Sequence, residues 1–279
     1  MCTKGRRAKV AKPSLVFQLR PDPNGEPVNE ALHTLIANPS PLALACLVAF
    51  AASILGGLSG FGTGLVLPVF LVPLVGVTHV IPVMAVAMLF NNGSRVVAFW
   101  RDVQWRHARL MLALGLPACV AGAYGYTLLN AAWVTLLLGS FLLISIPLRR
   151  LLNRAQFRFS AGAELGAGAF FGFINGGMTG TGVILISILM AGGVQGSALV
   201  ATDAVISVTM GLAKVVLFGT VAALNLELAL LGLLVGLCTA PGAFVARSLL
   251  KRIPAGVHAG FMELIVIAGA VALLWRARW

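Results

Sequence analysis

Apolar residues dominate the chain from residue 41 almost to its end, whereas residues 1–40 are polar and rich in Lys, Arg and Pro. The apolar runs are continuous rather than alternating, which predicts helices rather than strands. Gly, Pro and charged residues divide these runs into ten segments: 41–57, 60–75, 79–100, 108–129, 131–148, 160–175, 178–191, 196–218, 226–246 and 257–275. A complete membrane crossing takes about 20 residues. The regions 41–75 and 160–191 contain shorter segments split by Gly clusters, a pattern typical of the discontinuous helices of transporters.

The composition narrows the fold class. Of the 279 residues, 59% are apolar and 10% are charged, and the mean hydropathy is +0.98. Soluble domains carry about 25% charged residues, because polar surface must cover their core. These values exclude a soluble enzyme and a disordered chain. We expect an all-α membrane protein with about 8–10 transmembrane segments, some of them discontinuous.

An internal repeat divides the apolar part of the chain. The stretch around Gly62-Thr63-Gly64 recurs around Gly180-Thr181-Gly182, at an offset of 118 residues. The same offset aligns the ends of the long segments that follow the two stretches. An odd number of segments in each half gives the second half the opposite orientation in the membrane. The predicted organisation is a polar N-terminal arm at 1–40, a first transmembrane repeat at 41–155 and an inverted second repeat at 156–279.

The charge distribution predicts the orientation of the chain. Its net charge of +12 comes from 20 Lys and Arg against 8 Asp and Glu. The loops 101–109, 149–159 and 247–252 hold ten of the basic residues and fall on one side of the predicted topology, and the loops opposite hold none. The positive-inside rule places these loops in the cytoplasm, which predicts a multi-pass membrane protein with both termini on the other side of the membrane. The arm carries six basic residues of its own, so its side of the membrane stays open.

The two Gly clusters are the strongest local signal for a binding site. Inside a bilayer, non-helical backbone is tolerated where it is buried in protein or lines a cavity. A helix that restarts after such a break directs N–H groups and a positive dipole end toward the cavity. Close helix packing by small residues is the alternative explanation. Because the clusters are matched, we expect an anion site built from Gly62, Thr63, Gly64, Gly180, Thr181 and Gly182.

Charged residues within the apolar segments are costly in hydrocarbon and are therefore candidates for function. Arg95 and Lys214 lie at nearly equivalent repeat positions, so we expect each half to supply one cation to an anion pathway. Snorkelling to the interface is the alternative for both. Asp203 precedes Lys214 by three helical turns and either relays protons or pairs with a cation such as Arg95. Asn91 and Asn92 next to Arg95 predict hydrogen bonds to an oxyanion or between helices.

Signatures of enzymes and metal sites are missing from the sequence. It has no phosphate-binding loop, no HExxH motif and no Ser/His/Asp arrangement, so we expect no enzymatic activity, no cofactor and no metal. Without a nucleotide-binding domain, any active transport is secondary. The four Cys have no metal or disulfide spacing. Glu164 lies near a segment end and is expected to touch only the membrane interface, and His107 is expected to be structural.

Three motifs together resemble one known family. They are Gly56-Gly57-Leu58-Ser59-Gly60-Phe61-Gly62-Thr63-Gly64-Leu65-Val66-Leu67-Pro68, then Gly172-Phe173-Ile174-Asn175-Gly176-Gly177-Met178-Thr179-Gly180-Thr181-Gly182, and the loop Arg101-Asp102-Val103-Gln104-Trp105. Over about residues 41–279 the chain resembles the TauE/SafE (DUF81, TSUP) family of sulfite and organosulfonate transporters. Thr63 and Thr181 stand at glycine positions of the family pattern, which adds a hydroxyl donor to the expected site. Asp203 replaces a small polar residue of that pattern.

The resemblance implies bacterial inner-membrane transport of a small sulfur-containing anion, with export the commoner direction. We interpret the chain as a secondary transporter for sulfite or an organosulfonate, with proton coupling through Asp203. A passive anion channel, a thiosulfate or sulfate uptake permease and a non-transporting membrane scaffold are the alternatives. The expected partners are the small anion and the lipid bilayer, without nucleic acid, and a homodimer is left open.

Overall fold

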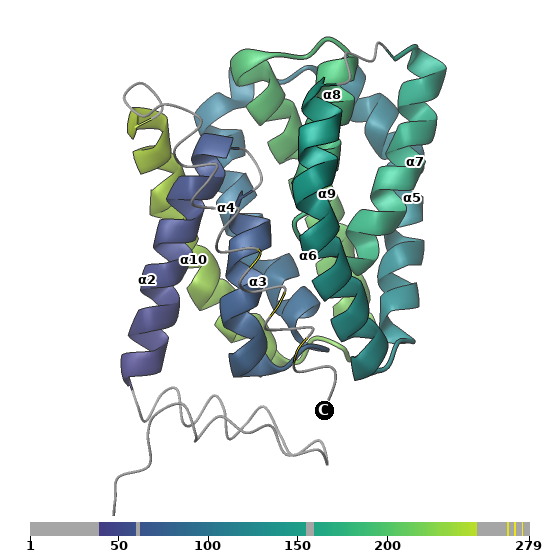
Figure 1. Ribbon diagram of the computed structural model, residues 1–279. Coiled ribbons are helices and arrows are strands. Elements are labelled where there is room, and N and C mark those ends of the chain that lie inside the picture. Colours follow the sequence, from purple (N-terminus) through teal and green to yellow (C-terminus); the bar gives the residue numbers. More distant parts are fainter. Residues whose placement is uncertain are drawn as a thin grey trace, which may run out of the picture.

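The computed structural model describes residues 39–59, 62–154 and 159–249, together with the single positions 267, 271 and 275. Within this part of the chain the secondary structure is helical throughout, without strands, which confirms the expected all-α fold. The elements are α2 (Pro39–Ser59), α3 (Gly62–Val75), α4 (Val80–Phe99), the short 3-10 helix η1 (Trp100–Asp102), α5 (Trp105–Thr127), α6 (Ala131–Arg154), α7 (Ala161–Gly177), α8 (Gly182–Ala191), α9 (Gly196–Thr220) and α10 (Leu226–Leu249). They run roughly along one common direction (Figure 1).

The predicted segments between 41 and 246 each correspond to one of these helices. Three stretches are long and apolar enough to cross a membrane by themselves: Val80–Asp102, Trp105–Thr127 and Gly196–Thr220. The predicted segment 178–191 begins later than expected, because residues 178–181 form the non-helical connection between α7 and α8. The N-terminal arm and nearly all of the predicted segment 257–275 lie outside the described residues.

Hydrogen bonds between loops and helix termini show which helix ends lie together at each end of the bundle. At one end, α4 ends and α5, α7 and α9 begin: the Gln104 N–H donates to Thr202 Oγ1 at 3.0 Å, and Phe159 N–H donates to the Ala191 carbonyl at 3.0 Å. We call this the arginine end, because Arg101, Arg106 and Arg109 are exposed there. At the opposite end the Tyr126 hydroxyl, near the end of α5, donates to the Thr78 carbonyl at 2.8 Å.

These contacts show that α7 and α8 form a hairpin that enters and leaves at the arginine end. The first helix of the described chain, α2, begins at the opposite end, and α3 returns to that end before α4 starts (Figure 1). Each of these two pairs is broken in the middle of the bundle, as the sequence predicts for 41–75 and 160–191. The loop 101–109 lies at the arginine end, and the connections at 76–79 and 128–130 lie opposite it.

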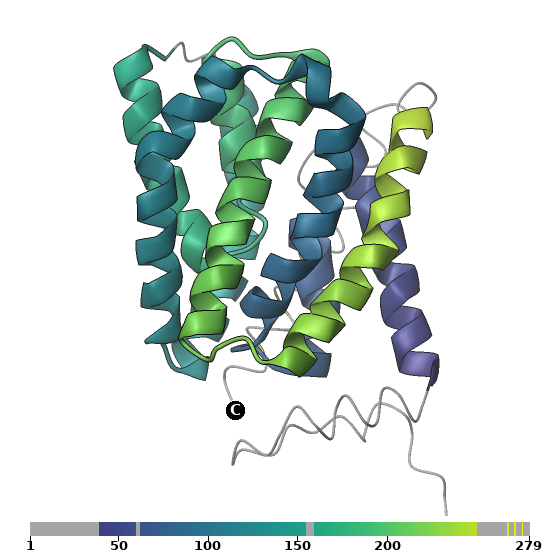
Figure 2. The ribbon, with the colours of Figure 1, turned by 180° about the vertical axis from the view of Figure 1, so that it is seen from behind.

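The packing pattern repeats between the two halves of the chain. At the offset of 118 residues, α2 to α5 correspond to α7 to α10. Helix α5 packs on α7, and its counterpart α10 packs on α2; α4 contacts α10 as α9 contacts α5 (Figures 1 and 2). The central contact between α4 and α9 joins the two halves. Equivalent helix pairs are what a duplicated unit produces, and the inversion of one unit relative to the other stays a prediction.

The outer surface of the bundle carries apolar side chains, whereas polar and charged side chains lie in its interior. Large apolar side chains such as Val97, Leu128 and Leu226 are at least 70% exposed on the outer surface. Polar and charged side chains are buried instead, among them Thr63, Asn91, Asn92, Arg95, Glu164, Thr181, Asp203 and Lys214. A surface of this kind suits contact with lipid rather than water. The buried polar groups therefore mark the interior surface on which function depends.

Helices α5 and α7 approach so closely that their backbones touch. A Cβ atom placed on Gly172 would lie 2.0 Å from the Gly115 carbonyl oxygen, and one on Gly176 would lie 2.2 Å from the Cys119 carbonyl oxygen. Small residues at such crossings are the main way in which helices pack tightly within membranes. This contact fixes α7, and with it the break before α8, against the long helix α5.

Replacing Gly172 with Ala tests this contact. We expect the variant Gly172→Ala to lose about 1–3 kcal/mol of unfolding free energy, because the added methyl group meets rigid backbone rather than a side chain. The matched control is Gly166→Ala in the same helix, where an added Cβ would have nothing within 4 Å. Unfolding of both variants in detergent micelles measures the difference, and equal stability would contradict the close approach.

Candidate functional site

Two helix starts meet at the centre of the bundle. The Thr179 hydroxyl, in the connection before α8, donates to the Gly64 carbonyl in the first turn of α3 at 3.0 Å. A Cβ atom on Gly64 would lie 2.9 Å from the Gly180 nitrogen, so the two backbones are in contact. Gly180 itself has φ +80, a conformation that residues with a Cβ adopt at a steric cost. The broken ends of α3 and α8 therefore form one unit, with contributions from both repeats.

A cavity lies beside this unit, with an empty volume of about 690 Å³ including the open space at its mouth. Its lining comes from both halves of the chain: Thr63, Gly64, Ile81, Met84, Ala85, Met88, Asn91, Asn92, Arg95, Phe171, Asn175, Thr179, Gly180, Thr181, Gly182, Asp203, Ser207, Gly211 and Lys214. The predicted site residues other than Gly62 are thus brought together; the surroundings of Gly62, the first residue of α3, lie outside what the structure describes. Their role in binding an anion stays a prediction.

Arg95 and Asp203 form an ion pair across the junction of α4 and α9. Arg95 Nη2 lies 2.9 Å from Asp203 Oδ2, and the two side chains are 4% and 2% exposed. Arg95 Nη1 also donates to Asn92 Oδ1 at 3.2 Å. Of the two roles considered for Asp203, pairing with Arg95 is therefore present. The Arg95 side chain is buried in this pair and does not extend to the membrane interface. The second carboxylate oxygen, Oδ1, is buried and makes no hydrogen bond within the described part of the protein.

Lys214 has a different environment. Its Nζ donates to the Asn175 carbonyl at 3.0 Å, in the last turn of α7, where the negative end of the helix dipole favours a cation. Among the described residues, no carboxylate lies within ion-pair distance of this ammonium group. An ammonium group has three N–H donors, so the other two are available to a ligand. Lys214 thus places an amino group in the cavity that no carboxylate of the described protein pairs with.

The hydroxyl groups of the two central threonines are engaged within the protein. Thr63 Oγ1 donates to the Ala52 carbonyl at 3.2 Å, and Thr181 Oγ1 donates to Asn175 Oδ1 at 2.8 Å. These bonds hold α3 on α2 and α8 on α7. Donors that an anion could use include the Lys214 ammonium and the N–H groups of Gly182 and Val183, which have no acceptor within α8. The N–H groups of Ile184 and Leu185 donate to the Thr181 carbonyl.

Asn175 is a candidate site residue that the sequence analysis did not single out. It supplies the carbonyl for Lys214 and the side-chain oxygen for Thr181, and it lines the cavity. Its position directly before Gly176-Gly177 was the available signal, because a polar side chain that precedes a helix break inside a membrane faces the protein interior. Thr179 lies in the same motif and clamps Gly64.

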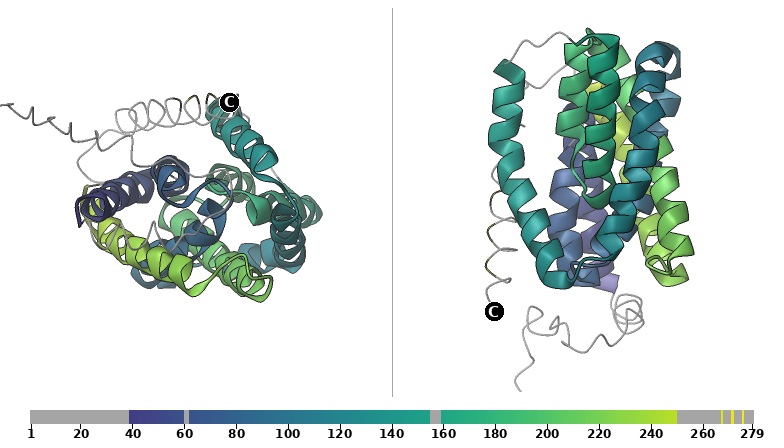
Figure 3. Two further views of the ribbon diagram at one scale, coloured as in Figure 1. Left: turned by 90° about the horizontal axis from the view of Figure 1, so that it is seen from below. Right: turned by 90° about the vertical axis from the view of Figure 1, so that its right-hand side faces the viewer.

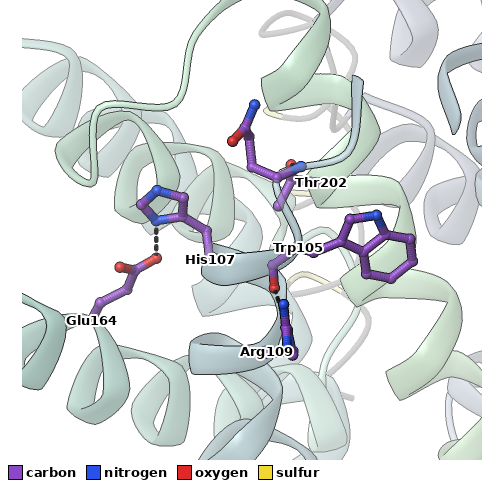
Figure 4. A network of polar contacts seen from close by, with 6 residues as sticks. Trp105, His107, Arg109, Glu164 and Thr202 are labelled. Atoms are coloured by element: carbon purple, nitrogen blue, oxygen red, sulfur yellow. Dashed lines mark hydrogen bonds and ion pairs between the residues drawn. The ribbon is translucent and has the colours of Figure 1, made fainter. Parts of the chain in front are cut away.

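The expectation for Glu164 is wrong. Glu164 is 1% exposed, and its Oε1 lies 2.6 Å from His107 Nδ1, as Figure 4 shows. The first turn of α7 packs so closely on α5 that the carboxylate is buried against His107 rather than placed at the membrane interface. Neither residue lines the cavity. The same view shows Thr202 near the start of α5, at the arginine end (Figure 4).

Comparison with known proteins gives one match. Residues 45–273 match the family model described as "Sulfite exporter TauE/SafE". No curated protein and no solved structure matches the chain. The matched range contains both broken helices and every residue that lines the cavity.

The energetic role of the Arg95–Asp203 pair is tested by comparing single and double replacements. Removing one partner of a buried ion pair costs about 3–5 kcal/mol, whereas replacing both with apolar residues is often neutral. We expect Arg95→Met to lower the unfolding free energy by an amount of this order and Arg95→Met/Asp203→Leu to recover most of it. Denaturant unfolding in detergent measures both variants. A double variant that is as unstable as the single one would show that Asp203 does not depend on Arg95 for compensation.

Proposed function

The chain belongs to the TauE/SafE family, and from this premise we propose that it is a secondary transporter that exports sulfite or an organosulfonate across the cytoplasmic membrane of a bacterium. Membership supports the general assignment, a membrane transporter of sulfur-containing anions rather than an enzyme. The observation that carries the finer proposal is Lys214, a buried cation in the cavity without a carboxylate partner in the described chain.

The charge of the cavity supports an anionic substrate. Among its lining residues, Arg95 and Lys214 are cations and Asp203 is the carboxylate. Because Arg95 and Asp203 neutralise each other, the excess is one positive charge at Lys214. An uncompensated charge is unfavourable in a buried site, so a bound monoanion relieves this cost. Hydrogensulfite and the sulfonate head group of an organosulfonate both carry one negative charge and several acceptor oxygens.

The lining combines polar and apolar groups. Lys214, Asn175 and the first turn of α8 present polar groups, and Ile81, Met84, Met88 and Phe171 present apolar side chains. The polar groups suit a sulfur oxyanion. The apolar side chains suit the carbon chain of an organosulfonate, and this favours organosulfonates as well as sulfite.

The proposed direction follows from elementary electrostatics. One elementary charge that crosses a potential of 100 mV gains or loses about 2.3 kcal/mol. An inside-negative potential therefore drives a monoanion outward without a coupling ion. Proton coupling is the further part of the proposal. It is supported by Asp203, which lines the cavity and whose buried Oδ1 makes no hydrogen bond within the described part of the protein.

Lys214 provides the direct test of the anion site. We expect Lys214→Gln to weaken binding by about 10–100-fold, because a charged hydrogen bond contributes about 1.5–3 kcal/mol. Lys214→Arg, which keeps the charge, should retain more of the affinity than Lys214→Gln. The measurement is uptake of labelled methanesulfonate and sulfite into proteoliposomes at several concentrations. The matched control is Arg109→Gln, an exposed cation at the arginine end that should leave the apparent affinity unchanged. Equal affinity in the Lys214→Gln and unsubstituted proteins would refute the assignment.

A second experiment tests proton coupling at Asp203. Methanesulfonate stays ionised across the physiological pH range, so a pH dependence of its flux belongs to the protein. Coupling that assists export exchanges the anion for an incoming proton. We therefore expect flux to rise when the compartment that receives the anion is acidified, and Asp203→Asn to abolish this response. Glu164→Gln removes the other buried carboxylate of the described chain and should keep the response. If Asp203→Asn retains the pH profile of the unsubstituted protein, Asp203 is not the coupling residue.

A further inference from the structure

The Arg95–Asp203 pair lies between the cavity and the arginine end. Arg95 is one turn from the end of α4, and Asp203 is two turns from the start of α9, and both of these helix termini belong to the arginine end. The pair lines the cavity at that side. Lys214 lies 11 residues farther along α9, a distance of about 16 Å along a helix axis. The two cations therefore occupy different depths of the same path.

A separate apolar cluster lies near the ion pair where α4, η1 and α9 meet. Val103, Ala201 and Val205 form this buried cluster, against which Val96 and Phe99 pack. The hydrogen bond from the Gln104 N–H to Thr202 Oγ1, at 3.0 Å, holds the start of α5 against α9 at the arginine end. The helix termini around the ion pair are thus packed together at this end.

We propose that the Arg95–Asp203 pair is a gate that closes the cavity toward the arginine end, and that the transported anion opens it by replacing Asp203 on Arg95. In this arrangement the Asp203 carboxylate occupies the position next to Arg95 that the transported anion takes when the gate opens. The identity of the displacing anion rests on the proposed function, whereas the location of the gate rests on the geometry of α4 and α9.

The energetics explain why an anion should be needed to open such a gate. Separating the pair without a replacement leaves two uncompensated charges in a buried site, which is strongly unfavourable. An incoming anion neutralises the charge of Arg95 throughout the exchange. The free-energy cost of opening is then only that of the Asp203 carboxylate, which loses its partner. The Asp203 carboxylate can then take up a proton or reach water. Since α4 belongs to one repeat and α9 to the other, the exchange also releases the direct ionic contact between the two halves.

The test measures access to Ser207, which lines the cavity one turn beyond Asp203 from the arginine end. The four native Cys are replaced, Ser207→Cys is introduced, and a cationic, membrane-impermeant methanethiosulfonate is applied from the side of the arginine end. We expect slow labelling with the ion pair intact and labelling at least about tenfold faster with Asp203→Asn. Because the reagent is a cation, the loss of the carboxylate charge alone would slow it. Methanesulfonate, which does not reduce disulfides as sulfite does, should accelerate labelling in the protein with the intact pair.

Three controls make the result decisive. Glu164→Gln removes the other buried carboxylate near this end and should not change the rate. Arg101→Cys, at an exposed position of the same end, should react equally fast with or without Asp203→Asn. The double variant Arg95→Gln/Asp203→Asn removes the pair without leaving a buried charge and should also be labelled fast, which covers the case in which the single variant fails to fold.

The outcomes separate the gate from the substrate. Labelling at the unsubstituted rate in both Asp203→Asn and the double variant would overturn the gate. Faster labelling in these variants without any effect of methanesulfonate would uphold the gate and overturn the exchange by this class of anion. Loss of methanesulfonate binding in Lys214→Gln, measured independently, reports on the proposed function alone.

Discussion

Two helix starts can meet at the centre of this bundle because Gly64 and Gly180 carry no side chains. The backbone contact between them, closed by the hydrogen bond from Thr179 to the Gly64 carbonyl, joins the broken ends of α3 and α8. A helix end within a membrane leaves backbone groups without partners unless protein or a polar cavity surrounds them. The neighbouring cavity, the engaged hydroxyls of Thr63 and Thr181, and the position of Asn175 all follow from the need to surround these ends.

The charged residues divide into two electrostatic arrangements around that centre. Arg95 is compensated within the protein by Asp203, and Lys214 has only a backbone carbonyl and a helix dipole for support in the described chain. This difference assigns different roles to two cations that look equivalent in the repeat. In the proposed cycle, Lys214 attracts an anion from outside the protein, and Arg95 keeps a contact between the halves that an anion can exchange. One unpaired and one paired cation would then allow successive binding events along a single path. Figure 3 shows the helices of both halves from below and from the side.

Much of this could be predicted from the sequence, because in a membrane protein the hydrophobic segments and the glycine breaks are dictated by the bilayer. The helices between residues 41 and 246, the two broken pairs and the clustering of the site residues followed from apolar length, from matched Gly-Thr-Gly triplets and from the cost of buried charge. Glu164 was misplaced because its depth depends on the approach of α7 to α5, which periodicity does not encode. The orientation of the Thr181 hydroxyl toward Asn175 likewise depends on the path of residues 178–181, where the chain is not helical.

The ion pair also has a consequence for how the protein is assembled. Arg95 is synthesised more than a hundred residues before Asp203, so α4, the third helix of the described chain, enters the membrane with a cation whose carboxylate partner has not yet been synthesised. Its position one turn from the helix end lets the long side chain reach the interface during this interval. When α9 is inserted, Arg95 can turn inward and pair with Asp203. This pair then links the first half of the protein to the second. The Arg95–Asp203 contact that forms when α9 is inserted would therefore be the same contact that is proposed to open during transport.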